Sequence, residues 1–93
     1  MRIEFDTAKR DATLEAHGLD FNDVAKVLGG FFLTRIDDRK DYGEVRHIVL
    51  GALDGRPVVV VWTPRADAVR VISIRIADDE EREIYWRERD RSR

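Results

Sequence analysis

Cysteine is absent from this chain of 93 residues, and proline occurs only twice. Without thiols there is no disulfide framework, no thiolate zinc site, no iron–sulfur cluster and no catalytic cysteine. No apolar run approaches the roughly 20 residues that span a bilayer, and residues 1–6 carry acidic groups where a signal peptide would be apolar. We therefore expect no membrane segment and a cytoplasmic protein.

An excess of positive charge is also missing. The 17 lysines and arginines are outnumbered by 19 aspartates and glutamates, for a net charge of −2. This balance argues against indiscriminate nucleic-acid binding but leaves room for a local basic patch. Within residues 65–93 every basic residue is an arginine, whose planar guanidinium binds phosphate in a way that lysine does not. A chain of this length has room for a single core, so residues 1–93 are expected to form one domain, and a hydrophobic content of 43% is enough for it to fold.

The first third of the chain has the pattern of one strand followed by two helices. Apolar residues alternate over residues 2–5, as they do in a strand. Asp6 and Asp20 stand where helix N-caps would stand, and glycines at 18 and 29 follow the two helical patterns. The second helix is therefore expected to run from Asp20 to about residue 28.

The remainder of the chain predicts four strands and a last helix. Asp54-Gly55 is a two-residue turn that predicts a hairpin, and Pro64 is expected to end the second strand of that hairpin. The expected strands are 31–36, 45–53, 56–63 and 69–76, with an exposed loop at 37–44 and a helix at 77–89. The order β-α-α-β-β-β-β-α indicates an α+β fold, a mainly antiparallel sheet with the helices packed on one face.

Two arginines lie in the expected strand 69–76. Strict alternation places Arg70 with the isoleucines and Arg75 on the opposite face. If the isoleucine face meets the helices, Arg75 points to open sheet surface, where a fixed guanidinium binds phosphate or carboxylate. The alternative is that Arg75 covers the sheet with its aliphatic stem or pairs with a neighbouring acid.

Three polar residues open the expected strand 45–53. Glu44, Arg46 and His47 could supply a base, a phosphate clamp and a proton shuttle. Glu44 and Arg46 fall on one face and His47 on the other, which weakens that combination. The alternative is a solvated strand end with a weak ion pair.

Other chemistry has little support in the sequence. His17 stands at a helix C-terminus, where a histidine satisfies the last carbonyls without any ligand. It is far from His47 in the sequence and no metal-binding spacing is present, so we expect no metal site. Phosphate-binding glycine loops are absent, and we expect no cofactor. Tyr85 and Trp86 are expected to serve the core or a partner contact.

Several short strings, taken in order, make the chain similar to the BrnT family of bacterial toxins. They run from residue 3 to about residue 85. The strings are Ile3-Glu4-Phe5-Asp6-Thr7-Ala8-Lys9, His17-Gly18-Leu19-Asp20-Phe21, Tyr42-Gly43-Glu44-Val45-Arg46, Arg70-Val71-Ile72-Ser73-Ile74-Arg75, Glu81-Arg82 and Tyr85.

The resemblance implies a RelE-like fold and a metal-independent endoribonuclease that inhibits translation. In such enzymes the 2′-hydroxyl of RNA attacks the adjacent phosphate while fixed cations stabilise the phosphorane. The family's recurring arginines match Arg46, Arg70 and Arg75, its acid matches Glu44, and its histidine matches His17. On this basis Arg75 and Arg46 are assigned to phosphate binding, with His17 or Glu44 as proton carriers.

The resemblance also implies partners. These are an RNA substrate and a BrnA-type antitoxin protein, with operator DNA contacted only through the antitoxin, because this chain has no helix-turn-helix or basic arm. Whether the toxin forms a homodimer within that complex is left open. We expect the antitoxin to contact the last helix near Tyr85 and Trp86, since aromatic residues are common anchors of interfaces.

The chain departs from the family pattern at four positions, Phe5, Thr13, Ala16 and Ile76. The resemblance would place basic residues at 16 and 76, and the acidic run 78–81 further repels phosphate. An alternative function therefore stands beside the enzyme. In it, a catalytically weak or inactive toxin-fold protein acts as an antitoxin-binding module and transcriptional co-repressor.

Overall fold

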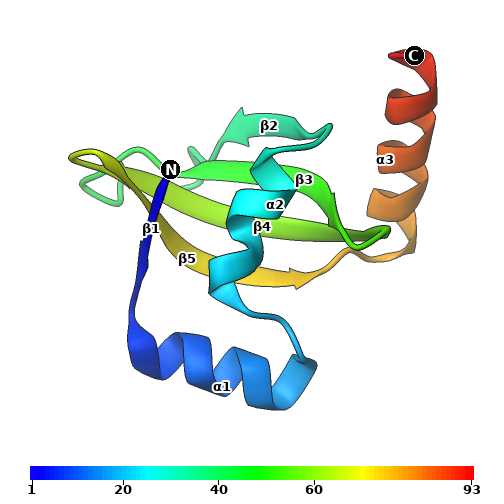
Figure 1. Cartoon of the computed structure of the whole chain (residues 1–93). Helices are drawn as coiled ribbons and strands as arrows, with labels where there is room; N and C mark the ends of the chain where they lie inside the picture. The colour runs from blue at the N-terminus through cyan, green and yellow to red at the C-terminus, as the bar shows by residue number, and fades with distance from the viewer.

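The computed structural model describes every residue from 1 to 93 and has a mixed α+β architecture (Figure 1). A short 3-10 helix, η1, precedes the second helix. The elements in chain order are β1 (Arg2–Phe5), α1 (Thr7–His17), η1 (Phe21–Asp23), α2 (Val24–Leu28), β2 (Leu33–Ile36), β3 (His47–Leu53), β4 (Arg56–Arg65), β5 (Ala68–Ile76) and α3 (Asp79–Arg91).

The five strands form one sheet in the order β1-β5-β4-β3-β2. β1 runs parallel to β5, and all other neighbours are antiparallel, so the prediction of a mainly antiparallel sheet is confirmed. β4 lies at the centre, and Val58, Val59 and Val60 are all buried. A run of valines is therefore explained by a strand that is covered on both sides.

The hairpin turn is where the sequence predicted it, but β4, the strand after it, is longer than predicted. Asp54 and Gly55 have φ angles of 52° and 82°, which confirms the predicted two-residue turn. The prediction that Pro64 ends β4 is wrong, because the strand continues to Arg65. The ladder between β3 and β4 stops at Trp62, so one side of β4 has no partner beyond it, and a residue without an N–H fits there.

A β-bulge in β5 changes which side chains share a face. Val61 pairs with Ser73 and Trp62 pairs with Val71, which leaves Ile72 as an extra residue. Val71 and Ile74 consequently both point into the core, although they are three positions apart. The prediction that Arg70 shares a face with the isoleucines is therefore wrong. Arg70 and Arg75 lie on the same face, opposite the core.

Helix boundaries follow the local capping chemistry. The side chain of Asp6 accepts a hydrogen bond from the backbone N–H of Lys9 at 3.0 Å, and Gly18 ends α1 with a φ of 69°. Asp20 accepts from the backbone N–H of Asn22 at 2.9 Å, but it begins η1 and not a regular helix. The predicted second helix is thus split into a 3-10 turn and the short α2.

The main core lies on the side of the sheet covered by η1 and α2, which we call the helix face. Phe21, Val24 and Val27 from these elements pack against the apolar side chains of the strands. Gly51 of β3 lies directly beneath α2, since a Cβ built there would stand 2.6 Å from Cγ1 of Val27. The chain therefore needs a glycine where helix and sheet approach most closely.

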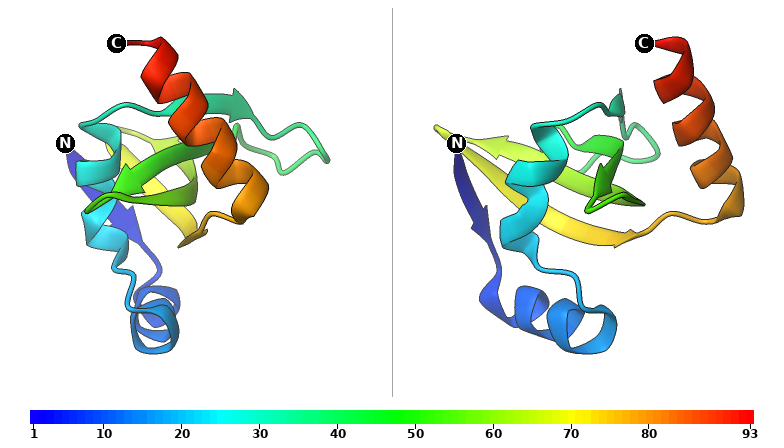
Figure 2. Two further views of the ribbon diagram at one scale, coloured as in Figure 1. Left: turned by 90° about the vertical axis from the view of Figure 1, so that its right-hand side faces the viewer. Right: turned by 45° about the vertical axis from the view of Figure 1, so that its right-hand side comes forward.

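The opposite side of the sheet, the far face, carries charged and aliphatic side chains. The prediction that all helices pack on one face is wrong for α3, which stands beyond one end of the sheet (Figures 1 and 2). Glu81 and Ile84 of α3 line the far face together with Leu50 and Val59. Leu50 and Val59 are aliphatic, and Ile84 of α3 gives them an apolar neighbour in place of water. None of the helices has both the length and the apolar composition that a membrane crossing requires.

Candidate active site

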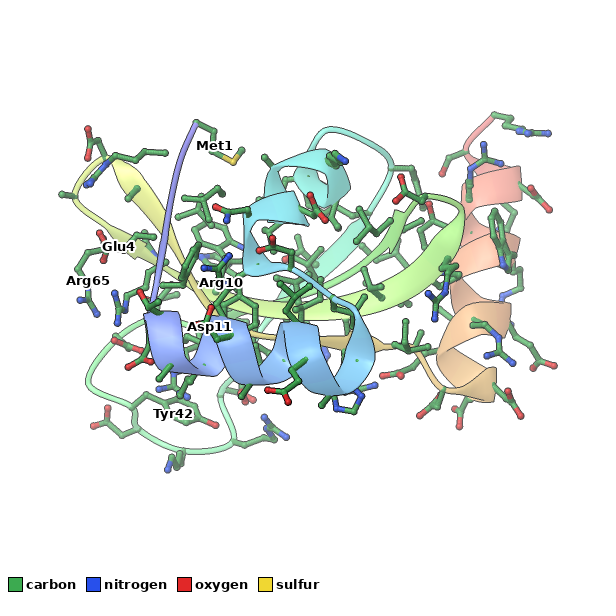
Figure 3. All side chains as sticks on the ribbon, turned by 60° about the horizontal axis from the view of Figure 1, so that its bottom comes forward. Met1, Glu4, Arg10, Asp11, Tyr42 and Arg65 are labelled. Atoms are coloured by element: carbon green, nitrogen blue, oxygen red, sulfur yellow. The ribbon has the colours of Figure 1, made fainter.

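Three arginines from separate segments meet two glutamates at the β1 end of the far face. Arg70 of β5 contacts Glu4 of β1 at 3.1 Å, and Arg46 contacts Glu44 at 3.0 Å. Arg65 of β4 lies 3.8 Å from both glutamates and so joins the two pairs, and Figure 3 shows it beside Glu4. We call these five residues the arginine cluster. Three guanidinium groups against two carboxylates leave one formal positive charge in excess.

Strand pairing brings the members of the arginine cluster together. The parallel register of β1 and β5 places Glu4 opposite Arg70, and the antiparallel register of β4 and β5 places Thr63 opposite Arg70. The buried hydroxyl of Thr63 donates a hydrogen bond of 2.6 Å to the carbonyl of Val45. This bond ties the segment that carries Glu44 and Arg46 to the centre of the sheet.

The loop between β2 and β3 holds Arg46 through a contact with the ring of Tyr42. The guanidinium carbon of Arg46 lies 4.0 Å from the centroid of the Tyr42 ring, and the Tyr42 hydroxyl donates to a carboxylate oxygen of Asp37 at 3.0 Å. Tyr42 is labelled on this loop in Figure 3. The contact between cation and ring, together with the bond to Asp37, fixes where the guanidinium can lie.

Asp37 anchors that loop. Its side chain is only 1% exposed, and it accepts two hydrogen bonds from the Arg39 guanidinium, at 2.8 and 2.7 Å. These bonds, with those from the backbone of Arg39 and from Tyr42, hold the pKa of Asp37 well below its usual range. A carboxylate that accepts four hydrogen bonds thus holds the loop next to the arginine cluster.

Arg75 lies apart from the arginine cluster. Its guanidinium makes two parallel hydrogen bonds to the carboxylate of Glu81 in α3, at 2.8 and 3.0 Å. The hydrogen bonds from Arg75 lower the pKa of Glu81 to about 2, and the same contact raises the pKa of Arg75. Arg75 pairs with Val59 and Arg70 with Thr63 on β4, so about 14 Å of strand separates the two arginines.

The two histidines lie outside the arginine cluster. His17 is the last residue of α1 and is exposed, and α1 lies below the sheet in the view of Figure 1. His47 stacks on Trp62 with 4.5 Å between ring centroids, on the helix face. Of the five predicted site residues, the structure brings together Glu44, Arg46 and Arg70, and it separates Arg75 and His17 from them.

The aromatic pair of α3 divides between two roles. Tyr85 is 3% exposed, and its hydroxyl donates to the carbonyl of Phe31 at 3.4 Å. Of the two roles expected for Tyr85, the core role is confirmed, because its ring docks α3 onto the segment before β2, and Tyr85 is too buried to anchor a partner. Trp86 is 38% exposed and stays available.

Sequence reasoning missed three residues of this region. Glu4 was not a candidate because its partner Arg70 is 66 residues away in the sequence. Arg65 was expected to lie beyond the end of the strand at Pro64. Tyr42 was named in the exposed loop and in a string similar to the family, but without a role in the site. No group of three or more histidine, aspartate or glutamate side chains converges in a geometry that would hold a metal ion.

Comparison with protein families gives one match. Residues 5–81 match the model of a family described as ribonuclease toxin, BrnT, of type II toxin-antitoxin system. No curated protein matches the chain. The matched segment contains every member of the arginine cluster except Glu4, together with Arg75 and Glu81, and it ends near the start of α3.

Proposed function

This chain belongs to the BrnT family of ribonuclease toxins of type II toxin–antitoxin systems, and we propose that it is a metal-independent endoribonuclease whose arginine cluster holds the scissile phosphate. One observation carries the assignment. Arg46, Arg65 and Arg70 converge from three segments on a face of the sheet that no helix covers at that end. A rigid sheet that presents several guanidinium groups is suited to a phosphate whose charge grows during the reaction.

The proposed reaction uses the RNA's own 2′-hydroxyl as nucleophile. Its oxygen bonds to the adjacent phosphorus, the bond from phosphorus to the 5′-oxygen breaks, and a 2′,3′-cyclic phosphate results. Arg46 and Arg70 stabilise the negative charge that builds on the phosphoryl oxygens. Glu44, 3.0 Å from Arg46, accepts the proton of the 2′-hydroxyl, and solvent supplies the proton to the leaving 5′-oxygen.

Not all of the predicted site residues take part in the proposed reaction. Arg46 and Glu44 keep the roles that the resemblance implied, and Arg70, which matched a recurring arginine of the family without a stated role, takes the second phosphate-binding role. Arg75 is engaged by Glu81, so we place it beside the substrate path and not at the reacting phosphate. His17 has no role in the proposed reaction, because α1 carries it away from the arginine cluster.

The test uses long single-stranded RNA in the presence of EDTA. Wild-type protein, freed of its partner, should cut this RNA and should leave RNA with 2′-deoxy sugars intact. Arg46→Ala should lower the rate by about 100-fold, the loss typical of removing one group that stabilises transition-state charge. Arg56→Ala, which removes an exposed arginine from the first position of β4, is the matched control. Equal rates for both variants would contradict the assignment.

The family also implies an antitoxin partner. We propose that this partner is a BrnA-type protein, that operator DNA is reached only through it, and that the complex is cytoplasmic. We further propose that the architecture is RelE-like, which is supported by two N-terminal helical segments followed by an antiparallel sheet. Co-expression with a BrnA-type protein should abolish RNA cleavage by the wild-type chain.

A second function is favoured by a different observation. Each guanidinium of the arginine cluster already faces a carboxylate, and the whole chain carries a net charge of −2. Both features weaken RNA binding and suit a catalytically weak toxin fold that serves as antitoxin-binding module and co-repressor. Absence of cleavage by folded wild-type protein, together with retained antitoxin binding, would select this function.

A further inference from the structure

A cavity of about 300 Å³ lies between the far face and α3. Its apolar wall is formed by Leu33, Ile48, Leu50, Val59 and Ile84. The volume is at the lower end of the range for ligand sites, about 300 to 1,000 Å³. It is too small for an α-helix, whose diameter with side chains is about 10 Å, but it accommodates a flat ring system.

One polar group on the wall of the cavity is a fixed acceptor. The carboxylate of Glu81 stays ionised, because hydrogen bonds from Arg75 lower its pKa to about 2. Its Oε1 accepts from Arg75 and from the backbone N–H of Asp78, whereas Oε2 accepts only from Arg75. Oε2 thus keeps one free lone pair. That lone pair suits a single N–H donor, such as the exocyclic amino group of a nucleobase.

A free cation also lines the cavity. Arg35 of β2 lines the cavity, and no carboxylate lies within ion-pair distance of it, in contrast to Arg39 and Arg75. An unpaired guanidinium next to an apolar cavity is suited to the phosphate of a nucleotide whose base is inserted. The cavity therefore offers an apolar wall for the ring, an acceptor for an amino group and a cation for a phosphate.

We propose that this cavity is a nucleobase subsite that prefers adenine, cytosine or guanine over uracil, and that it binds a nucleotide of the RNA next to the scissile phosphate. The proposal rests on the proposed ribonuclease function. Arg46 directly precedes β3, and Ile48 is two residues further along the chain, so the cavity begins about 7 Å from the arginine cluster. An extended RNA strand can therefore reach both. Uracil is disfavoured because it has no exocyclic amino group, and its one base N–H, at N3, lies between two carbonyl oxygens whose lone pairs repel the Glu81 carboxylate.

The first experiment measures binding without cleavage. Short fluorescent single-stranded oligonucleotides of adenine, cytosine or uracil carry 2′-O-methyl groups, which remove the nucleophile. Wild-type protein should bind the adenine and cytosine probes about 10-fold more tightly than the uracil probe, the effect of one hydrogen bond to a charged group. Equal affinity for all three probes would overturn the proposal.

Glu81→Gln tests the acceptor without removing the helix cap, because glutamine also serves in a capping box. An amide offers both a donor and an acceptor, so the preference over uracil should shrink to within about 2-fold. A role of Glu81 in α3 stability alone would leave that preference unchanged. Arg35→Ala should weaken all three probes about equally and lower the slope of log affinity against log salt by about one. Arg56→Ala, with the same change of charge elsewhere, should change neither property.

A second measurement locates the base. Methyl NMR spectra of the wild-type protein should show shifts at Leu50, Val59 and Ile84 when cytidine monophosphate is added, and weaker shifts with uridine monophosphate. If these methyl groups respond only to the antitoxin, the cavity is a protein contact and the subsite is refuted. RNA that stays uncut while the base preference persists would instead refute the ribonuclease function and leave the subsite standing.

Discussion

The two faces of the sheet have opposite compositions. The helix face meets Phe21, Val24 and Val27 in a closed apolar core, whereas the far face carries the arginine cluster at one end and an open cavity at the other. Apolar burial stabilises the fold, and fixed charges on a rigid scaffold bind and orient a substrate. If the proposed function holds, stability and RNA cleavage depend on different sides of the same strands, so substitutions on the two faces should affect different measurements.

The largest expected effect is on the helix face. Phe21 is 1% exposed and its ring meets that of Phe5 edge to face, with centroids 5.8 Å apart. Phe21→Ala should lower the free energy of unfolding by about 3 to 5 kcal/mol, the usual loss for a buried aromatic ring, as measured by urea denaturation. Arg46→Ala should change that energy by less than about 1 kcal/mol. Similar losses for both variants would contradict the division between the faces.

Gly51 gives a smaller effect on the same face. Adding a methyl group there forces Cγ1 of Val27 to move, since the two carbons would otherwise be 2.6 Å apart. Gly51→Ala should therefore destabilise the protein by about 1 to 3 kcal/mol, as overpacking does, in thermal or urea unfolding. Gly30→Ala is a suitable control, because the nearest atom to its Cβ is 3.9 Å away. A neutral Gly51→Ala would indicate that α2 can shift away from β3.

The sequence predicted most elements of the fold but not how β5 is phased. Alternation, capping aspartates and the Asp54-Gly55 turn are local signals, and the strands and helices they predicted are present. The bulge at Ile72 depends on pairing with β4, which a local pattern does not contain. It moved Arg70 to the face of Arg75 and so changed the candidate site itself.

The ion pair between Arg75 and Glu81 predicts a pH dependence. The pKa of Glu81 falls from its ordinary value of 4.5 to about 2 in the folded protein. Its contribution to stability is therefore fully present above about pH 4.5 and is lost as the pH falls toward about 2. The free energy of unfolding of the wild type should exceed that of Glu81→Gln by about 1 kcal/mol at neutral pH. This difference, measured by urea denaturation, should vanish near pH 2. A difference that does not change with pH would exclude the ion pair as its source.

The candidate site shows where sequence reasoning stops. Glu44 and Arg46 were predicted to share a face because they are two residues apart, and they contact each other. Glu4 and Arg65 join them because β1 pairs with β5, far away in the sequence, and because Arg65 of β4 reaches Glu4. Such long-range contacts follow from topology, which local residue patterns do not encode.

The smallest predicted effect concerns how the loop aims Arg46. Tyr42→Phe keeps the ring beneath the guanidinium but removes the hydrogen bond to Asp37, whereas Tyr42→Leu removes both contacts. Cleavage should fall by about 3-fold for phenylalanine and about 10-fold for leucine, since a cation on an aromatic ring contributes about 0.5 to 1 kcal/mol at a partly exposed site. If Tyr42→Leu cleaves RNA as fast as Tyr42→Phe, the ring does not contribute and Glu44 alone positions Arg46. A graded loss in the catalytic rate, measured at a temperature where all variants stay folded, would show that the loop between β2 and β3 positions Arg46.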